Sequence, residues 1–396
     1  MKNMTPATGV PARSELPDPA TCRHPRNPGA PLIPREDWIK EPWSSWTYLH
    51  TSEMMPTAPI WRGPGPVRPL PESVQPLGQV MINLEDGKVS VDDFLARSAT
   101  DGFLVLHRGQ IVFERYFNHF APHTHHLVMS VTKSFTGTLA GILADKGLID
   151  VQRPVTHYLP ELEATAYKGA TVQQLLDMAS GVTFDATPLW NSVWHHQQKP
   201  GWPRTYWEAI LSLDKSERPH GAAFKYRDIE TDVVAFILQR ASGRLLADLI
   251  SDEIWAPMGA ERDAYIVVDE SGFGTSASGL CATMRDLGRF AQLLVEGGAF
   301  AGRHIIPRNW IEETRHGRGW RFGSYEECGQ TGYHNFWWID NSSRGALLAH
   351  GYGGQVIYVD PNAELAAVKL SYHLGRPRSE VGSVVMPAIR AALGRN

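Results

Sequence analysis

The stretch from Met129 to Gly147 constrains the fold more than any other part of the chain, because it predicts a helix that has to be buried. Its apolar side chains recur at intervals of three and four residues, which places them in one stripe along a helix. Gly147 favours the end of the helix, since glycine readily adopts the left-handed backbone of a C′ residue. The fold must therefore enclose this stripe. The apolar residues are Val131, Phe135, Leu139, Ile142 and Leu143.

Ser130 and Lys133 stand three positions apart at the start of this helix. Residues at that spacing share a helix face, so we expect the hydroxyl and the amine to lie side by side. A buried lysine either loses its proton easily or holds its charge beside the serine, and both states favour a nucleophile. The alternative is that Ser130 only caps the helix. Ser212 and Lys215 repeat the spacing next to a charged turn, and we interpret that pair as surface.

Length and composition are those of an ordinary soluble globular protein, with 396 residues, 42% hydrophobic and 20% charged. A net charge of −4 and a pI near 6.5 argue against a nucleic-acid or membrane-surface partner. Three cysteines without a C-x-x-C pair favour a reducing compartment. We find no signal-peptide segment in residues 1–20 and no apolar run long enough to cross a membrane. A cytoplasmic protein is expected.

The N-terminal part of the chain is rich in proline, since residues 1–76 hold sixteen of the 28 prolines. Proline breaks helices and removes donors from sheets, so this part should be irregular. It also contains aromatic residues that favour burial. We therefore expect residues 1–90 to form an arm packed on a main domain of residues 91–396. The aromatic residues of the arm are Trp38, Trp43, Trp46, Tyr48 and Trp61.

The order of elements in the main domain predicts an α+β fold, an α/β sandwich. Two β-rich runs about Arg108-Gly109 indicate an early hairpin at residues 102–116. Helical patterns dominate residues 148–262, and strands return near the C-terminus. The late strands most simply join the hairpin in one antiparallel sheet flanked by helices, with 148–262 as an inserted helical subdomain. The predicted late strands are 333–339, 346–350, 355–359 and 364–371, followed by a helix at 382–393.

Two further segments could join Ser130 in a site. Tyr226 precedes a helix that begins near Thr231, and a tyrosine there can take a proton from a serine if a cation such as Lys133 lowers its pKa. The alternatives are a core tyrosine and an Asp228 that only caps the helix. Backbone N–H groups in the glycine-rich segment His350–Gln355 can bind a developing oxyanion. A tight turn is the alternative there.

Taken together, the segments Ser130–Lys133, Tyr226–Asp228 and His350–Gly353 resemble the S-x-x-K, Y-x-N and K/H-x-G motifs of the penicillin-recognising serine hydrolases, the class C β-lactamase family. Within this family the chain is most similar to 6-aminohexanoate-dimer hydrolases and related carboxylesterases. The segments Met129–Ser134 and Gly354–Pro361 and the proline-rich arm carry that resemblance. It implies a β-lactamase/transpeptidase-like fold.

The resemblance also implies an acyl-enzyme on Ser130, with Tyr226 and Lys133 moving its proton and no cofactor or metal. The oxyanion is expected between the N–H of Ser130 and an N–H near Tyr352. Substrate contacts are expected from Asp228, His350, Tyr352 and Gly353. Asp228 stands where β-lactamases have Asn, and the third motif has no Lys. Its register within His350–Gly353 stays open.

The expected substrate is a small amide or ester. A D-aminopeptidase, a β-lactamase-type enzyme and a non-catalytic binding protein on the same fold are the alternatives, and a homodimer is left open. His119, His123, His125 and His126 lack zinc-site spacing, so we interpret them as loop residues.

Overall fold

The computed structural model describes Ile33 and residues 36–316, 320–321, 332–340, 345–373 and 380–394. The first 32 residues of the expected arm and residues 317–319 and 322–331 lie outside the described residues, as do Cys22 and Cys328.

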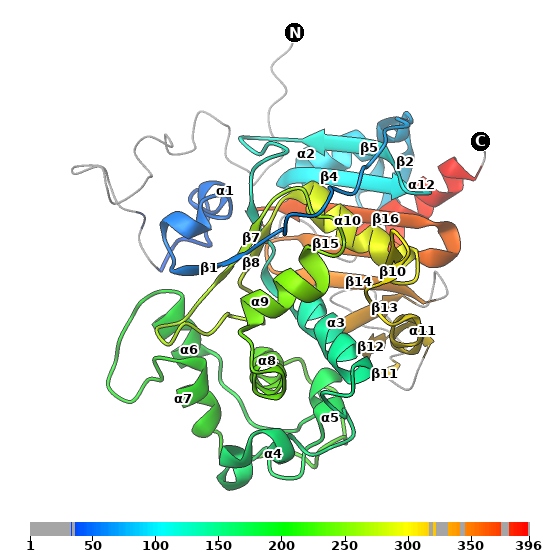
Figure 1. Ribbon diagram of the computed structural model, residues 1–396. Coiled ribbons are helices and arrows are strands. Elements are labelled where there is room, and N and C mark those ends of the chain that lie inside the picture. Colours follow the sequence, from blue (N-terminus) through cyan, green and yellow to red (C-terminus); the bar gives the residue numbers. More distant parts are fainter. Residues whose placement is uncertain are drawn as a thin grey trace.

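An eight-stranded antiparallel sheet forms the centre of the molecule, in the order β11-β12-β13-β14-β15-β16-β4-β5 (Figure 1). The early hairpin β4–β5 joins the late strands through β16, which pairs with β4. The predicted single antiparallel sheet is therefore confirmed. Its strands are β4 Thr100–His107, β5 Gln110–Tyr116, β11 Trp320–Arg321, β12 Gly332–His334, β13 Trp337–Asp340, β14 Ala346–Gly351, β15 Gln355–Asp360 and β16 Leu365–Ser371.

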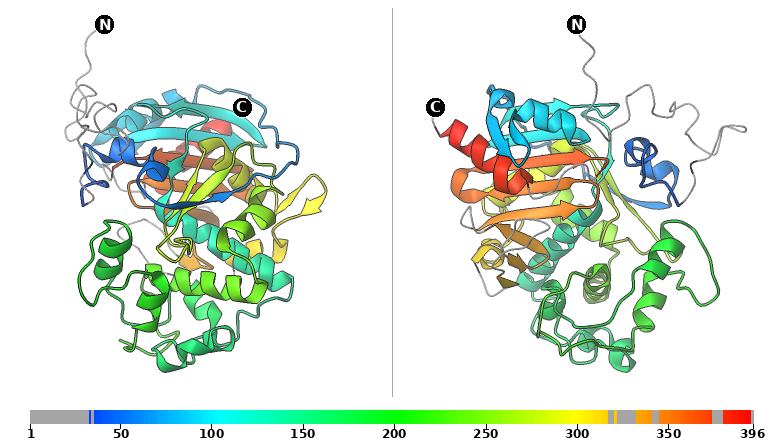
Figure 2. Two further views of the ribbon diagram at one scale, coloured as in Figure 1. Left: turned by 60° about the vertical axis from the view of Figure 1, so that its left-hand side comes forward. Right: turned by 180° about the vertical axis from the view of Figure 1, so that it is seen from behind.

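Helices cover both faces of this sheet, which makes the predicted α/β sandwich (Figures 1 and 2). On one face lie α3 (Thr132–Asp145) and α10 (Met284–Val295). On the other lie α2 (Val91–Arg97) and α12 (Met386–Leu393), the latter preceded by a π-helical turn at Val381–Val385. Strands buried on both faces are apolar along most of their length.

The predicted strand 333–339 is wrong in one respect, because it is two short strands, β12 and β13, joined by a tight turn. Asn335 and Phe336 both have positive φ, at 50° and 61°. Asn335 is of a residue type that favours this backbone, but aromatic and β-branched residues dominate the run and led to the prediction of one continuous strand. The turn lies against α3, since a Cβ added at Gly137 would lie 2.1 Å from the carbonyl oxygen of Asn335.

Helices of four to fifteen residues, joined by long connections, occupy residues 148–262, as expected. Figure 1 shows this region below the sheet, with α8 next to α3. Thr171 and Gln174 form a capping box at the start of α5. The helices are α4 Val155–Tyr158, α5 Val172–Leu176, α6 Thr187–Val193, α7 Tyr206–Leu211, α8 Asp228–Ser242 and α9 Leu246–Ile250, with 3₁₀ or π turns at Pro160–Ala164 and Ser251–Trp255.

A second, four-stranded sheet in the order β1-β7-β8-β6 ties the arm to the body. Pairing of β1 with β7 places Ile60 opposite Ala264. These strands have two to four residues each, too few for an alternating pattern to reveal them. The remaining elements are β1 Thr57–Ile60, β2 Met81–Leu84, β3 Gly87–Ser90, β6 His126–Leu127, β7 Ala264–Val267, β8 Leu280–Ala282, β9 Ala299–Phe300, β10 Arg303–His304, α1 Ser44–Thr47 and α11 Arg308–His316, with 3₁₀ turns at Thr51–Glu53, Leu77–Gln79, Met129–Val131 and Pro361–Ala363.

The described part of the chain contains no helix with the length and apolar character needed to cross a membrane.

Candidate active site

Ser130 lies in a 3₁₀ turn, Met129–Val131, that leads directly into α3. Met129 has φ of 50°, a left-handed backbone that costs energy for a residue with a long side chain. The hydroxyl of Thr132 donates to the carbonyl oxygen of Met129 at 2.7 Å and stabilises this conformation. The serine is thus presented on a strained turn at the start of a buried helix.

Lys133 places its amine against this serine, as the three-residue spacing predicted. Its Nζ donates to Ser130 Oγ at 3.0 Å. The helix α3 begins with Val131 as its N-cap, and no side chain caps it. The structure therefore does not support the alternative in which Ser130 serves as a cap.

The Lys133 amine also contacts the Ala277 carbonyl and the Asp228 carboxylate. The carbonyl oxygen of Ala277 accepts at 2.8 Å, and Asp228 Oδ1 lies at 2.6 Å. Lys133 is almost fully buried, whereas the side chain of Asp228 is 44% exposed. The ion pair therefore joins a buried cation to a carboxylate at the mouth of the site.

Burial alone would lower the pKa of Lys133, but the Asp228 carboxylate and the neighbouring Tyr226 outweigh it and raise that pKa. Of the two lysine states left open by the sequence, the geometry favours the charged one. The alternative in which Asp228 only caps the helix is wrong, because Arg227 is the N-cap of α8 and Asp228, its first residue, pairs its carboxylate with Lys133.

Tyr226 lies beside both groups. Its ring centroid is 5.0 Å from Lys133 Nζ, and its hydroxyl hydrogen-bonds with Ser130 and Lys133. The ring stacks on Trp338 of β13 at 5.9 Å with 13° between the planes. Burial raises the pKa of Tyr226; Lys133 lowers it, as expected, but does not outweigh burial and Asp228. The expectation of a tyrosine with a lowered pKa is therefore wrong.

The glycine-rich third segment comes close to the serine turn at Gly351, the last residue of β14. A Cβ there would lie 2.3 Å from the carbonyl oxygen of Val128, so only glycine allows this approach. The turn that follows exposes Tyr352 and passes through Gly353 with φ of 80°. His350 is buried within β14. The strand end thus lies beside the serine turn, with Tyr352 at the surface.

Gln355 holds this turn in place. Its Nε2 donates to the carbonyl oxygens of Tyr352 at 3.2 Å and of Ser371 at 2.5 Å. Its Oε1 accepts from the N–H of Ser371 at 3.1 Å. The turn is therefore fixed to β16 through a fully buried side chain.

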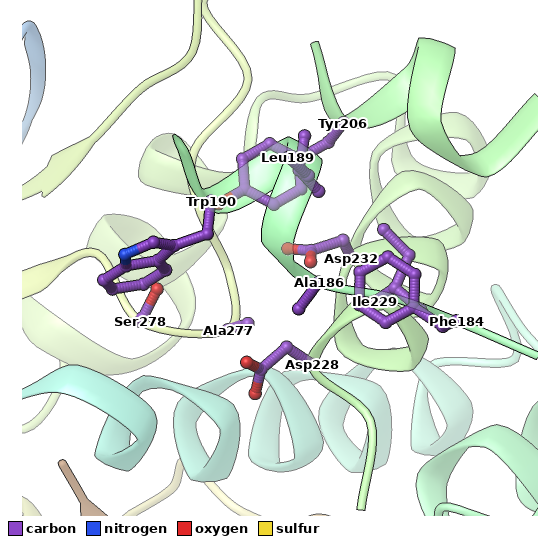
Figure 3. Close-up of a pocket in the computed structure, with 10 residues that line it drawn as sticks. All are labelled: Phe184, Ala186, Leu189, Trp190, Tyr206, Asp228, Ile229, Asp232, Ala277 and Ser278. Carbon is purple, nitrogen blue, oxygen red and sulfur yellow. The ribbon is translucent and has the colours of Figure 1, made fainter. Parts of the chain in front are cut away.

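A pocket adjoins the Lys133 amine through two of the groups that bind it, Asp228 and Ala277 (Figure 3). The space between its walls is about 310 Å³, a volume that includes the open solvent at its mouth. Most of its lining is apolar or aromatic, so it suits a hydrocarbon chain. Trp190 of α6 contributes an aromatic ring to the pocket wall. The lining residues are Phe184, Ala186, Leu189, Trp190, Tyr206, Asp228, Ile229, Asp232, Ala277 and Ser278.

The second Ser-x-x-Lys has none of these features. Ser212 ends α7 and donates its hydroxyl to the carbonyl oxygen of Ala209 at 2.7 Å. Lys215 is exposed. The pair is a surface feature, as interpreted from the sequence.

Sequence reasoning missed three groups around the site. The carbonyl of Ala277 and the ring of Trp338 come from distant segments, and no local pattern marks them. Asp232 did leave a signal, because it stands four residues after Asp228 and so shares its helix face.

Comparison with known proteins places these features in a family context. Residues 90–383 match the Beta-lactamase family. A 6-aminohexanoate-dimer hydrolase of Paenarthrobacter ureafaciens is 33% identical over 377 residues, which cover 89% of this chain and 92% of that protein.

Solved structures agree with this result. A Bacillus anthracis structure assigned as a 6-aminohexanoate-dimer hydrolase superposes with a TM-score of 0.82 at 28% identity, over 92% of this chain and 96% of that one. A family VIII carboxylesterase gives a TM-score of 0.60 at 19% identity, over 77% and 94% of the two chains, and shows a shared fold.

Proposed function

Because the chain belongs to the beta-lactamase family, we propose that it is a serine hydrolase that cleaves a small amide or ester through an acyl-enzyme on Ser130. The observation that carries this proposal is the contact of 3.0 Å between Lys133 Nζ and Ser130 Oγ, with Tyr226 and Asp228 beside it. A serine next to a buried lysine and a tyrosine is an arrangement suited to acyl transfer.

In the first step Ser130 Oγ forms a bond to the substrate carbonyl carbon and passes its proton to Tyr226, which reacts as the phenolate that the charged Lys133 stabilises. Tyr226 then returns this proton to the leaving amine or alcohol as its bond to carbon breaks. Water then cleaves the acyl-enzyme and restores the serine hydroxyl. Asp228 balances the charge of Lys133 throughout, since its carboxylate is 2.6 Å from the amine.

The oxyanion of the tetrahedral intermediate is assigned to the N–H groups of Ser130 and Tyr352. Gly351 brings the end of β14 against the serine turn, which supports this assignment. His350 lies buried behind it and would support the strand, while Gly353 allows the turn. Backbone donors in such a position stabilise negative charge that develops on the carbonyl oxygen.

The substrate is a linear amide or ester whose chain occupies the apolar pocket next to Asp228. The amide is suggested by the name of the relative with 33% identity, a 6-aminohexanoate-dimer hydrolase. A location in the cytoplasm is proposed because the chain has only three cysteines and no C-x-x-C pair.

Ser130→Ala tests the proposal. We expect hydrolysis of p-nitrophenyl acetate to fall about a thousandfold or more, and labelling by a fluorophosphonate to disappear. Ser212→Ala is the matched control, since it removes the serine of the second Ser-x-x-Lys and should leave both readouts unchanged. Full activity in Ser130→Ala would refute the acyl-enzyme.

A panel of short-chain esters, linear amides and a chromogenic cephalosporin separates the proposed substrates from the alternatives. A preference for D-amino-acid amides or for the cephalosporin would indicate the peptidase or the β-lactamase. A protein that reacts with none of them would be the non-catalytic relative.

A further inference from the structure

Asp232 is a buried carboxyl group that the acyl-transfer steps do not use. It follows Asp228 by one turn of α8 and is fully buried. Figure 3 shows its carboxyl group among the residues that line the pocket, between Tyr206 and Ala277. A substrate chain in this pocket would therefore meet it.

One oxygen of Asp232 has partners and the other has none. Oδ1 accepts from the hydroxyl of Ser276 at 2.7 Å, and the N–H of Ala277 also interacts with the carboxyl group. Oδ2 is buried, and the described residues offer it no hydrogen-bond partner. Buried polar atoms are nearly always paired, so a ligand in the pocket would supply the missing partner.

The surroundings of Asp232 favour the neutral acid. The cation that acts on it, Lys133, is already engaged by Asp228 and by the carbonyl of Ala277. The other titratable groups that face it are Asp228, which is a second carboxylate, and the buried phenols Tyr206 and Tyr167. Burial without a cation of its own raises the pKa of Asp232 to about 8.

In a neutral carboxyl group one oxygen carries a proton, and in Asp232 the oxygen without a partner, Oδ2, can carry it. We propose that Asp232 is a substrate-binding residue that donates a hydrogen bond from Oδ2 to a carbonyl or ether oxygen on the substrate chain. This proposal rests on the proposed function, because it names the chain that the hydrolase accepts. The apolar neighbours Leu189, Trp190 and Ile229 would contact the methylene groups on either side of that oxygen.

Two pairs of esters of equal chain length test the proposal. In the acyl part, p-nitrophenyl levulinate carries a ketone oxygen that p-nitrophenyl valerate lacks. In the alcohol part, methoxybutyl acetate carries an ether oxygen that hexyl acetate lacks. Each kcat/KM is divided by the rate of uncatalysed hydrolysis. A p-nitrophenyl aminovalerate, which carries a terminal ammonium group, tests the opposite case, in which Asp232 is a charged carboxylate and binds a cation.

In the wild-type enzyme we expect the oxygen-bearing ester of at least one pair to be favoured by roughly three- to tenfold at pH 6.5, the ratio that one net hydrogen bond supplies. The preference should disappear as the pH rises through about 8, because Asp232 then loses the donated proton.

Two variants distinguish the hydrogen bond that Asp232 donates from the negative charge that it gains at high pH. Asp232→Asn retains an N–H donor and does not titrate, so its preference should persist to high pH. Asp232→Ala should show no preference at any pH. Asp252→Asn, at a carboxylate paired with Arg244, is the matched control and should retain the wild-type pH dependence.

Equal rates within both pairs for the wild-type enzyme would overturn the proposal, and so would a preference for the ammonium ester that grows with pH. If Asp232→Ala does not fold, the pH dependence of the wild-type preference for the oxygen-bearing ester still tests the proposal. Loss of all ester hydrolysis would count against the proposed function instead. In that case ligand-observed NMR of levulinamide and valeramide with Ser130→Ala protein compares the same two chains without turnover.

Discussion

At the scale of single residues, the lysine of the site is held in its charged state. Asp228 takes the place of the asparagine of the resembled motif and binds Lys133 at 2.6 Å. A carboxylate stabilises an ammonium more than an amide does, because it carries a full charge. Asp228 also raises the pKa of Tyr226. One substitution relative to the family motif thus sets the proton affinity of both groups beside Ser130.

Replacing Asp228 by Asn should therefore move the alkaline limb of the kcat/KM profile to lower pH. Lys133 would lose the carboxylate that raises its pKa, so the charge that it holds beside Tyr226 would be lost at a lower pH. The measurement is the pH dependence of kcat/KM for a short-chain ester. Asp228→Glu keeps the charge and is the control. If the alkaline limb of the kcat/KM profile does not move in Asp228→Asn, the ion pair with Asp228 does not set the pKa of Lys133.

Tyr226→Phe should reduce turnover by roughly a hundredfold or more, because it removes the hydroxyl that hydrogen-bonds with Ser130 and Lys133 while keeping the ring stacked on Trp338. The melting temperature should change little. Tyr158→Phe, at a tyrosine that accepts from the N–H of Asp150 away from the site, is the control. Unchanged turnover in Tyr226→Phe would exclude it from the proton transfer.

At the scale of elements, α3 and the β12–β13 hairpin fix each other. The hydroxyl of Ser134 donates to the carbonyl oxygen of Phe336 at 2.9 Å, and Gly137 lies against the carbonyl of Asn335. The hairpin also carries Trp338, which stacks on Tyr226. The position of the nucleophile helix and that of the tyrosine therefore depend on one short turn.

Gly137→Ala should destabilise the protein by about 1–3 kcal/mol, because the added methyl group would meet the Asn335 carbonyl at 2.1 Å. An exposed helical glycine would gain stability from the same change. Urea unfolding measures the difference. Gly65→Ala is the control, since open space surrounds its added Cβ and its φ is not left-handed. Equal stability of Gly137→Ala and wild type would mean that this turn moves freely.

His334 ties the same hairpin to two helices, and its ion pairs predict a pH dependence of stability. Its two ring nitrogens lie 2.6 Å from Asp177, which follows α5, and 2.6 Å from Glu313 of α11. Burial lowers the pKa of His334, but the two carboxylates raise it to about 9, from 6.5 for an isolated histidine.

Because the folded-state pKa is the higher one, the imidazolium stabilises the fold fully below pH 6.5, and this contribution is lost as the pH rises through about 9. The loss should amount to up to about 3 kcal/mol. Urea unfolding at pH 6, 7.5 and 9.5 measures it against His334→Gln, in which this part of the decline should be absent. Parallel profiles for the two proteins would rule out His334 as the source.

At the scale of the whole molecule, the N-terminal arm completes the active-site region. Trp38 stacks on Trp190 at 6.2 Å and on Trp194 at 5.4 Å, and Trp190 lines the pocket. Tyr48 packs against the turn at Gly353. The arm therefore contacts both the pocket wall and the third motif, although it precedes them by more than a hundred residues.

Trp38→Ala should raise KM for a chain-bearing ester about tenfold and cost roughly 3–5 kcal/mol of stability, because it removes one of the two tryptophan rings that stack on Trp190. Steady-state kinetics and urea unfolding measure the two effects. Trp61→Ala, at a tryptophan of the same arm that is 56% exposed, should change neither. A stable Trp38→Ala enzyme with unchanged KM would show that the arm does not shape the pocket.

The sequence by itself determined the features that depend on local geometry. Helix periodicity placed Ser130 beside Lys133, and Gly147 ended the helix with φ of 70°. The ordered strands predicted one antiparallel sheet, and the three motifs placed the chain in its family. The helix and the strands follow from repeats of the backbone over a few residues, which a sequence displays directly, whereas the family followed from the resemblance of the motifs.

Only the tertiary structure decided which distant groups meet at the serine. The Ala277 carbonyl is a backbone atom that any residue would supply, and Trp338 reaches Tyr226 only because a turn of two left-handed residues reverses the chain before it. The raised pKa of Tyr226 likewise arises from burial, which no local pattern reveals. Contacts across the fold depend on how whole elements pack, and the short strands and turns that set this packing are too brief to leave a period in the sequence.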